Sequence, residues 1–258
     1  MSKKSPLDNG ILADLPGDVY ERMLPDLEPV ALEFGRTLYG ANHKLNEVYF
    51  LVDSIVSKVY LSSEGKSAEI GLIGREGMVG IALFMSGENM PVDTIVQSSG
   101  SAYRMRARSF MQEFESDGAL QHVLLRFTQA FIAQMGQTAV CNRHHTVEQQ
   151  LCRWLLLNLD RLPGDHLIMT QDMIANLLGV RREGITRAVG VLTEAGLIEH
   201  GRGRVEVIDR DGLEARACEC YAVVRQAYAN LLPFRDHEPR LVEALVGSAA
   251  PLEVRVAI

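Results

Sequence analysis

Short hydrophobic runs separated by polar turns dominate the first part of the chain, from about residue 30 to residue 110. The runs are rich in β-branched and aromatic residues, as in EVYFLVDSIVSKVYL and DTIVQSSGSAYRMRA, and glycines interrupt them. Turn signals recur roughly every 8–12 residues, which is typical of antiparallel all-β domains. The pattern therefore predicts a small antiparallel barrel or jelly roll in this region.

The period of the hydrophobic positions changes after residue 117. No proline occurs from about Gly118 to Leu159, and apolar side chains recur at spacings of three and four residues. This spacing predicts one long amphipathic helix. We expect its seam to pair with the same helix of a second subunit in a two-fold dimer, through Leu120, Leu124, Phe127, Phe131, Met135 and Thr138. The alternative is that this face packs against the barrel of its own chain.

The segment that follows has the spacing of a helix-turn-helix. Counting from Gln171 as position one, Ala175 falls at five, Gly179 at nine and Ile185 at fifteen. A small residue at Ala175 lets the second helix cross closely, and Gly179 allows a turn with positive φ. Ile185 fills the space between the helices. These positions predict two short helices that cross tightly.

The polar residues of this motif predict contact with DNA. Four of them project from one side of the second helix and are candidates for reading bases: Arg182, Glu183, Thr186 and Arg187. Arginine can donate two hydrogen bonds to guanine, and glutamate can accept one from cytosine. Four others are candidates for contacting phosphates: Thr170, Arg181, Arg202 and Arg204. The first two stand at helix starts, which favour anions, and the last two lie in a basic β-hairpin that forms a wing.

These patterns divide the chain into four parts of an α+β fold. We predict an antiparallel jelly-roll domain over residues 1–117 and a dimerisation helix over 118–160. A winged helix-turn-helix is expected over 161–212, and a C-terminal helix with a loosely specified tail over 213–258. Pro163 and Gly164 mark the boundary after the long helix because they stop helical continuation.

The chain is acidic overall, with a formal net charge of -7. This charge excludes broad attraction to nucleic acid, so only a local basic face can bind DNA. The first residues hold no apolar run of signal-peptide length, and no later stretch offers about 18 uncharged apolar residues in a row. We therefore expect a cytoplasmic protein without a membrane partner.

Signatures of enzymes and metal sites are lacking in the sequence. It contains no phosphate-binding loop, nucleophile elbow or metal-ligand spacing, so we predict a protein that is not an enzyme and binds neither metal nor cofactor. Cys218 and Cys220 would stand about 200° apart on a helix and could not easily share a metal. His144 and Glu148, four residues apart, are explained as solvent-facing polar residues. Reduced and mostly buried thiols are expected at Cys141, Cys152, Cys218 and Cys220.

From about residue 30 to residue 215, the order and spacing of these features resemble the Crp/Fnr family of bacterial transcription regulators. The segment EVYFLVDSIVSKVYLSSEGKSAEIGLIGREGMVG resembles the family's β-roll, TVEQQLCRWLLLNLDRLPG its hinge helix, and LGVRREGITRAVGVLTEAGLI its recognition helix. The resemblance implies a homodimer with a cyclic-nucleotide-binding-type β-roll and a winged helix that reads a palindromic site in double-stranded DNA. It also implies RNA polymerase as a partner, and base reading by Arg182, Glu183 and Arg187.

One segment departs from the family pattern. Members that bind cyclic nucleotides carry a Gly-Glu pair after the glycine-rich turn, and an Arg-Ser or Arg-Thr pair further along. At the corresponding positions of the effector pocket, this chain has Gly80, Ile81, Val92 and Asp93. The ribose acceptor and the counter-charge of the phosphate are missing, and Asp93 would repel a phosphate. We therefore predict that the β-roll does not bind cyclic AMP in the family's usual way.

The working hypothesis is a homodimeric, sequence-specific transcription regulator. A signal at the β-roll would act by shifting the helix pair or the hinge between Leu159 and Gly164. Two alternatives stay open. One is a regulator that responds to cyclic AMP through a non-standard pocket, and the other is an adaptor on the same fold that binds no DNA.

Overall fold

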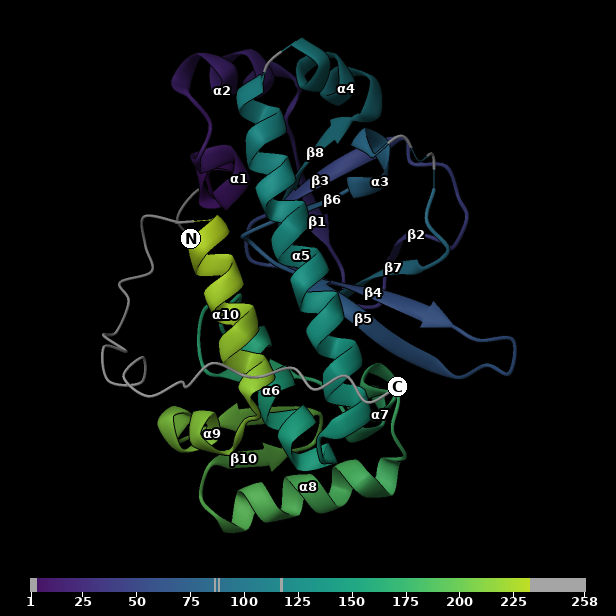
Figure 1. The fold of residues 1–258 in the computed structure, drawn as a ribbon, viewed down its shortest axis with the longest axis vertical. Helices are drawn as coiled ribbons and strands as arrows, with labels where there is room; N and C mark the ends of the chain where they lie inside the picture. Colours follow the sequence, from purple (N-terminus) through teal and green to yellow (C-terminus); the bar gives the residue numbers. More distant parts are fainter. Residues whose placement is uncertain (1–3, 86, 88, 117, 233–258) are drawn as a thin grey trace, which may run out of the picture.

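A computed structural model of the chain describes residues 4–85, 87, 89–116 and 118–232. Figure 1 shows most strands in the upper half of the molecule and a group of helices with a small sheet at the lower end, with helix α5 (Gly118–His144) running between them. No helix in the described ranges is both long enough and apolar enough to cross a bilayer. The tail predicted after residue 232 lies outside the described residues.

The N-terminal domain is built on two four-stranded sheets whose strands all pair antiparallel. One sheet has the order β1-β8-β3-β6, and the other has the order β2-β7-β4-β5. The apolar runs of the sequence form the core, and Val48 and Phe50 of β3 are fully buried. The strands are β1 Glu28–Leu32, β2 Thr37–Tyr39, β3 Glu47–Leu51, β4 Ile55–Leu61, β5 Ser67–Ile73, β6 Met78–Val79, β7 Asp93–Ser98 and β8 Gly100–Arg106. The predicted antiparallel jelly roll, or β-roll, is confirmed.

A buried asparagine fastens the short N-terminal helices to the β-roll. The Oδ1 atom of Asn9 accepts the backbone N–H of Leu12 and caps α1. Its Nδ2 atom donates to the backbone carbonyls of Leu51 and Gly77, at 2.8 and 2.9 Å. The elements of this segment are the 3-10 helices η1 Pro6–Asp8 and η2 Leu24–Asp26, with α1 Gly10–Ala13 and α2 Gly17–Met23.

Helix α5, Gly118–His144, lies along the β-roll and supplies part of its core (Figure 1). The rings of Phe127 and Phe131 are buried in the same apolar cluster as the strands. They approach the backbone of Gly77 and Gly71 so closely that a Cβ atom at either glycine would clash with them. Two shorter helices precede α5 along the chain, α3 Ile81–Phe84 and α4 Ala107–Ser116.

The predicted dimer seam lies on this inner face of α5 and has to be corrected. All six residues pack within their own chain, because aromatic and aliphatic side chains of α5 close the core of the β-roll. Met135 is partly buried, and the other five are at most 9% exposed: Leu120, Leu124, Phe127, Phe131 and Thr138. The exposed large apolar side chains of α5 are Leu125, Ile132 and Val140.

The segment predicted as one helix up to Leu159 forms two helices. Helix α5 ends at His144, and α6 spans Val147–Leu159. Thr146 caps α6, because its Oγ1 accepts the N–H of Gln149 at 3.3 Å while the Gln149 side chain accepts the N–H of Thr146 at 3.1 Å. This reciprocal capping box has a sequence signature, Thr-x-x-Gln, that could have predicted the break.

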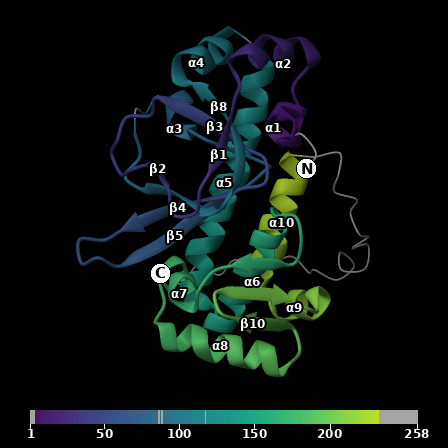
Figure 2. The same cartoon turned by 180° about the vertical axis from the view of Figure 1, so that it is seen from behind.

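The C-terminal part is a winged helix followed by two helices. Its core combines α6, the helix-turn-helix and a three-stranded antiparallel sheet of order β10-β11-β9. In Figures 1 and 2, α10 (Glu219–Leu231) runs back beside α5 toward α1. The elements are β9 His166–Ile168, α7 Gln171–Leu178, α8 Arg182–Glu194, β10 Ile198–Gly201, β11 Arg204–Val207, α9 Arg210–Arg216 and α10 Glu219–Leu231.

Arg161, just after α6, joins the two domains. Its buried guanidinium forms a 2.6 Å ion pair with Glu76 of the β-roll. It also donates to Oε1 of Gln134 on α5 at 3.1 Å, and it lies over the ring of Tyr228 on α10. A single charged side chain therefore contacts the β-roll, the long helix and the last described helix.

Candidate nucleic-acid interface

The helix-turn-helix forms at the predicted positions. Helix α7 begins after Thr170, whose Oγ1 accepts the N–H of Met173 at 3.3 Å. It ends at Gly179, which adopts the left-handed conformation with a φ of 67°. Ala175 and Ile185 are buried in the core of this domain. The apolar positions therefore fix the crossing of the helices and leave the polar side of α8 facing outward.

The four predicted base-reading residues lie on the exposed side of α8. Glu183, Thr186 and Arg187 are exposed, and the side chain of Arg182 is 65% exposed. They occupy the first half of the helix, which begins at Arg182. The structure thus brings these four side chains together on one surface.

Two residues at the start of α7 hold side chains of this surface in place. Oδ1 of Asp172 lies 3.2 Å from Nε of Arg182. Oε1 of Gln171 accepts a hydrogen bond from Oγ1 of Thr186 at 2.8 Å. Sequence reasoning assigned no such role to Gln171 or Asp172. Their place in the first turn of α7, beside the start of α8 in a helix-turn-helix, is the signal that could have found them.

The predicted phosphate contacts at the helix starts are also exposed. Arg181 is the N-cap residue of α8, and its own side chain does not cap the first turn of this helix. Its first N–H groups therefore stand at an exposed helix start, where the partial positive charge favours an anion. The hydroxyl oxygen of Thr170 accepts the cap bond of α7, so the hydroxyl hydrogen can still be donated.

The wing is the hairpin of β10 and β11, which pair antiparallel. Gly203 turns the chain with a φ of 71°, and Arg202 and Arg204 on either side of it are exposed. Nη2 of Arg204 lies 2.8 Å from Oε2 of Glu206, so a carboxylate partly offsets its charge. Arg202 therefore offers the stronger positive charge at the tip.

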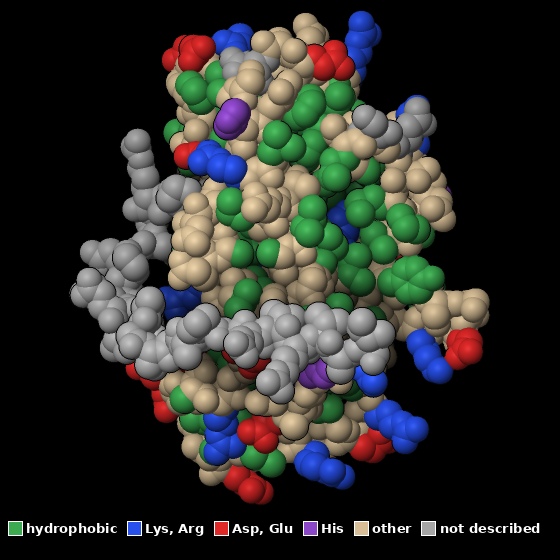
Figure 3. All heavy atoms as spheres, in the orientation of Figure 1, with side chains coloured by type: hydrophobic (Ala, Val, Ile, Leu, Met, Phe, Trp, Pro, Cys, Tyr) green, Lys and Arg blue, Asp and Glu red, His purple; other side chains and the backbone are tan. Residues whose placement is uncertain are grey.

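Charged side chains of both signs gather at the lower end of the molecule, over the winged helix (Figure 3). The predicted contact residues on this end carry an excess of positive charge, although the chain as a whole is acidic. They comprise five arginines, two threonines and one glutamate: Arg181, Arg182, Arg187, Arg202, Arg204, Thr170, Thr186 and Glu183. A local attraction for phosphate is thus combined with an acidic remainder.

The four predicted effector-pocket residues serve the packing of the β-roll. Gly80 starts α3 with a φ of 128°, and Ile81 and Val92 are buried. Oδ1 of Asp93 accepts the backbone N–H of Ala41 at 2.8 Å, so this carboxylate holds the segment between β2 and β3. A phosphate placed beside these residues would meet a carboxylate and apolar side chains.

A buried polar group inside the β-roll was missed by sequence reasoning. Ser57 donates to Oε2 of Glu69 at 2.6 Å, and the indole N–H of Trp154 donates to Oε1 of Glu69 at 3.2 Å. Burial raises the pKa of Glu69 above its usual value. Lys58, the next residue in the strand, has a separate buried partner: it donates to Oγ1 of Thr94 at 2.7 Å, and burial lowers the pKa of Lys58 to about 8. The Ser-Lys pair inside the apolar strand IVSKVYL is the signal for this group.

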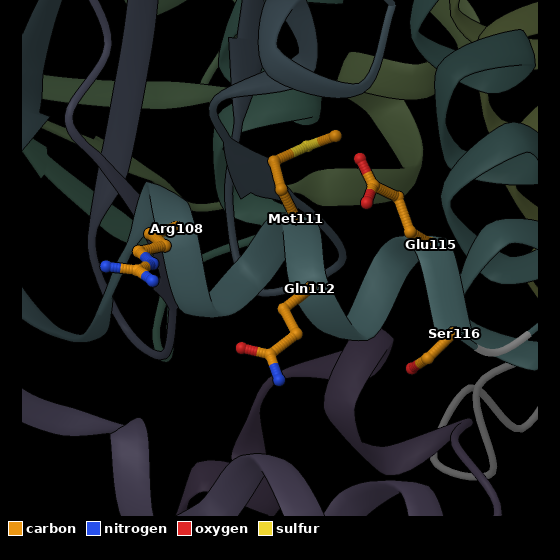
Figure 4. A pocket seen from close by; sticks show the side chains of 5 residues that line it. All are labelled: Arg108, Met111, Gln112, Glu115 and Ser116. Carbon is orange, nitrogen blue, oxygen red and sulfur yellow. The ribbon is translucent and has the colours of Figure 1, made fainter.

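An open hollow lies over α4, at the end of the molecule opposite to α8 (Figures 1 and 4). Five side chains of this one helix line it: Arg108, Met111, Gln112, Glu115 and Ser116. Figure 4 shows them spread along the helix. None of the predicted site residues lines this hollow, so it adds no ligand site to those already described.

Two family models match the chain. A Crp-like helix-turn-helix domain matches residues 149–216, which include most of α6 and continue to the end of α9. A cyclic nucleotide-binding domain matches residues 29–117, the region of the β-roll and α4. A comparison with curated proteins finds no match.

Solved structures share the arrangement of both domains at low sequence identity. A candidate transcriptional regulator of the Crp/Fnr family from Eubacterium rectale is similar with a TM-score of 0.64 and 16% identity, over 81% of this chain and 98% of its own. FixK2 from Bradyrhizobium japonicum has a TM-score of 0.63 and 17% identity, over 74% and 98%. The c-di-GMP responsive regulator CLP from Xanthomonas campestris has a TM-score of 0.55 and 18% identity, over 74% and 99%. At these identities the similarity shows the fold.

Proposed function

The chain belongs to the Crp/Fnr family of transcriptional regulators, and we propose that it acts as a homodimer on a palindromic DNA site. Its helix-turn-helix domain is a DNA-binding domain, and its β-roll is a cyclic-nucleotide-binding-like domain. The observation that carries the proposal is the outward face of α8, where four polar side chains stand exposed directly after the left-handed turn. Neither the symmetry of the site nor the bases that it contains follow from family membership.

Arg182 and Arg187 are suited to guanine, and Glu183 is suited to cytosine. A well-placed arginine donates two hydrogen bonds to O6 and N7 of guanine, which discriminates against a wrong base by about 1–3 kcal/mol. The contact of Arg182 with Asp172 is exposed on both sides, and such ion pairs contribute only about 0–1 kcal/mol. Arg182 can therefore exchange Asp172 for a base at little cost.

Phosphate contacts would set the register of the head on the duplex. Thr170 and Arg181 stand at the starts of α7 and α8, and Arg202 and Arg204 flank the turn of the wing. These two groups lie on either side of the base-reading helix in the chain. Contacts of this kind position a protein without carrying sequence information, and they make affinity steeply dependent on salt.

The dimer is proposed to form through the outer face of α5. Leu125, Ile132 and Ala139 recur every seven positions and form one apolar stripe on this face. The positions that alternate with them are small or polar: His122, Gln129, Gly136 and Arg143. All of them are exposed, including Leu125 and Ile132, and Gly136 leaves open space for a close approach. Figure 3 shows apolar side chains on this side of the molecule. Two paired α5 helices would set the two α8 helices about one DNA turn, roughly 34 Å, apart.

The β-roll is proposed not to bind cyclic AMP in the family's usual way. Ile81 and Val92 are buried apolar residues, and Asp93 is engaged by a backbone N–H. The rings of Phe127 and Phe131 fill the space between α5 and the strands. Calorimetry that found micromolar cyclic AMP binding coupled to DNA affinity would contradict this proposal.

RNA polymerase is the proposed protein partner, since family members act on transcription. An assay of polymerase recruitment to a promoter carrying the selected site would test this. Polymerase held on such DNA only when the protein is present is the expected result. Equal retention with and without the protein would contradict it.

The test of DNA binding compares three arginine variants on a selected site and on scrambled DNA. Arg182→Ala should weaken binding to the selected site by about 10-fold to 100-fold and relax the preference at one base pair of each half-site. Arg202→Ala should weaken binding to all sequences alike and lower the salt slope by about one. Arg108→Ala, an exposed arginine on α4, is the matched control and should change neither quantity.

Two outcomes of this experiment would contradict the proposal. Equal and sequence-independent losses from Arg182→Ala and Arg202→Ala would remove the base-reading role. A wild-type protein that forms no specific complex with a steep salt dependence would favour the adaptor alternative.

A further inference from the structure

Three cysteines and a histidine that are far apart in the sequence meet at one point of the fold. Each contributes one ligand atom, and the four atoms all lie within 4.8 Å of one another. We call this group the Cys3His cluster: Cys141, His145, Cys218 and Cys220. The three cysteines are buried and form an apolar cluster of their own, separate from the cores of the two domains. No residue of the cluster belongs to the DNA-binding face.

The sequence-based expectation that Cys218 and Cys220 diverge is wrong for a simple reason. Cys218 is the N-cap residue of α10, with an extended backbone at φ -74° and ψ 164°, so it lies outside the helix. The helical angle between the two cysteines therefore does not apply, and both thiols reach the last turn of α5. Sγ of Cys218 lies 3.5 Å from Sγ of Cys141, and Sγ of Cys220 lies 3.5 Å from Nδ1 of His145.

Two of these separations are close to the edges of a tetrahedron around one metal ion. Zn–S bonds of about 2.3 Å and Zn–N bonds of about 2.0–2.1 Å place two ligand atoms of a tetrahedral site about 3.6–3.8 Å apart. The pairs Cys141–Cys218 and Cys220–His145 each lie at 3.5 Å. The four ligand atoms all lie within 4.8 Å of one another, so an ion would draw the widest pairs together by no more than about 1 Å. An iron–sulfur cluster spreads its cysteine ligands over several metal atoms, which calls for wider spacing.

The surroundings of the cluster also suit a metal. Nε2 of His145 lies 3.2 Å from Oε1 of Glu219, so a proton on Nε2 leaves Nδ1 free to face the sulfur atoms. A carboxylate on the far nitrogen is the usual support of a metal-bound histidine. The His145 side chain is 14% exposed, which gives an ion a path from solvent.

The charge balance points the same way. A divalent ion with three thiolates and a neutral histidine carries a net charge of about -1, and a buried site of this charge needs a nearby cation. Arg153 is such a cation, buried on α6, the helix that begins directly after His145 and Thr146. Its Nε atom has no hydrogen-bond acceptor in the part of the chain that the structure describes.

We propose that the Cys3His cluster binds one Zn²⁺ ion per chain and fastens α10 to the end of α5. The ion would join the last turn of the long helix, the turn before α6 and the first turn of α10. Since α10 follows the winged helix and runs back beside α5, the ion holds the winged helix against the long helix (Figure 2). This assignment concerns the metal alone and does not depend on DNA binding.

The test uses the full chain, purified under reducing conditions, stripped with a chelator and titrated with Co²⁺. One Co²⁺ per chain should bind, with thiolate-to-cobalt charge-transfer absorption and the intense visible bands of tetrahedral coordination. One equivalent of Zn²⁺ should displace it and raise the melting temperature. Protein that is purified without added metal should contain up to one zinc per chain by mass spectrometry.

Variants separate the cluster from other thiols. Cys218→Ser and Cys220→Ser should weaken Co²⁺ binding by at least about 100-fold. Glu219→Gln, which changes the carboxylate beside Nε2 of His145, should weaken it by about 10-fold. Cys152→Ser is the matched control, because Cys152 is a buried cysteine on α6 outside the cluster, and it should bind as the wild type does. His145→Gln changes a partly exposed side chain and keeps the test valid if a cysteine variant fails to fold.

Three results would overturn the proposal. They are an octahedral cobalt spectrum without charge-transfer absorption, an equal loss of binding in Cys152→Ser, and a Cys141–Cys218 disulfide in air-exposed protein whose reduced form takes up no metal.

Discussion

The winged helix and the β-roll use charged side chains in opposite ways. Arg182 of the winged helix is mostly exposed, and its contact with Asp172 can be exchanged for another partner. Lys58 and Glu69 of the β-roll are buried and hydrogen-bonded to neighbours in the same fold. The recognition surface therefore keeps its charged side chains available to an outside partner. The buried polar groups of the β-roll instead form hydrogen bonds that stabilise the domain.

The two sides of α5 repeat this contrast with apolar residues. Phe127 on the inner side is fully buried in the β-roll, whereas Ile132 on the outer side is 53% exposed. The inner side therefore belongs to the stability of one chain, and the outer side is open to a second chain.

The largest effect is expected where the two regions meet. Arg161→Met should lower the free energy of unfolding by about 3–5 kcal/mol, because it leaves the buried Glu76 carboxylate without its partner. Differential scanning calorimetry should then show separate transitions for the β-roll and the winged helix. Adding Glu76→Gln to this variant should recover part of the lost unfolding free energy, because the amide carries no charge. A single transition with unchanged midpoint would show that Arg161 does not couple the regions.

The contrast between the two sides of α5 is tested by two truncations. Phe127→Ala should cost on the order of 3 kcal/mol of unfolding free energy, since it leaves a cavity in the core. Ile132→Ala should cost a monomer about 0.5 kcal/mol or less and instead raise the dissociation constant of the dimer. Denaturant titrations and sedimentation equilibrium measure the two quantities. If Phe127→Ala altered only the oligomeric state, the assignment of the two faces would be reversed.

Removing the charge of the buried Lys58 should change the unfolding free energy less than Arg161→Met or Phe127→Ala does, and this change should depend on pH. The pKa of this lysine falls from 10.5 unfolded to about 8 folded, so the folded state pays for burying a charge below pH 8. This cost fades as the pH rises from 8 to 10.5, because only the unfolded state then binds the proton. Lys58→Met should thus stabilise the protein by about 2 kcal/mol at pH 7 and by less at pH 10.

An exposed arginine supplies the control for this prediction. Arg187→Met lies on the surface of α8 and should change stability by no more than about 0.5 kcal/mol at either pH. A Lys58→Met gain that did not shrink between pH 8 and pH 10.5 would contradict the link to the buried ammonium group.

The winged helix could be predicted from sequence because its determinants are local. Ala175, Gly179 and Ile185 occupy fixed spacings within one short segment, and the polar residues between them must then face outward. The jelly roll could be predicted as a class, because alternation and turns are also local. The positioning roles of Gln171 and Asp172 could not be predicted, since their contacts with α8 depend on how two helices cross.

The dimer face could not be assigned because α5 carries apolar residues on both sides. Phe127 and Ile132 each belong to a series spaced by three and four, so periodicity alone does not say which series meets the β-roll. The larger, aromatic side chains of α5 fill the core of the β-roll. Side-chain size therefore distinguishes the inner face of this helix from its outer face better than periodicity does.

The Cys3His cluster could not be predicted from the sequence for a different reason. Cys141 and Cys218 are 77 residues apart in the sequence. They meet because α10 packs back along α5. A helical Cys218 would point its thiol in the wrong direction, because this residue is an extended N-cap. The histidine that contacts Cys220 is His145, next to the predicted solvent-facing His144.

Selection of bound sites from random DNA tests whether the protein reads bases as a dimer. The wild-type protein should enrich an inverted repeat whose half-site centres lie about 10–10.5 base pairs apart, as two α8 helices on one dimer require. Sites selected by Arg182→Ala should keep this spacing and lose the preference at one base pair in each half. Enrichment of no sequence, or of single half-sites without a fixed spacing, would contradict a dimeric, base-reading regulator.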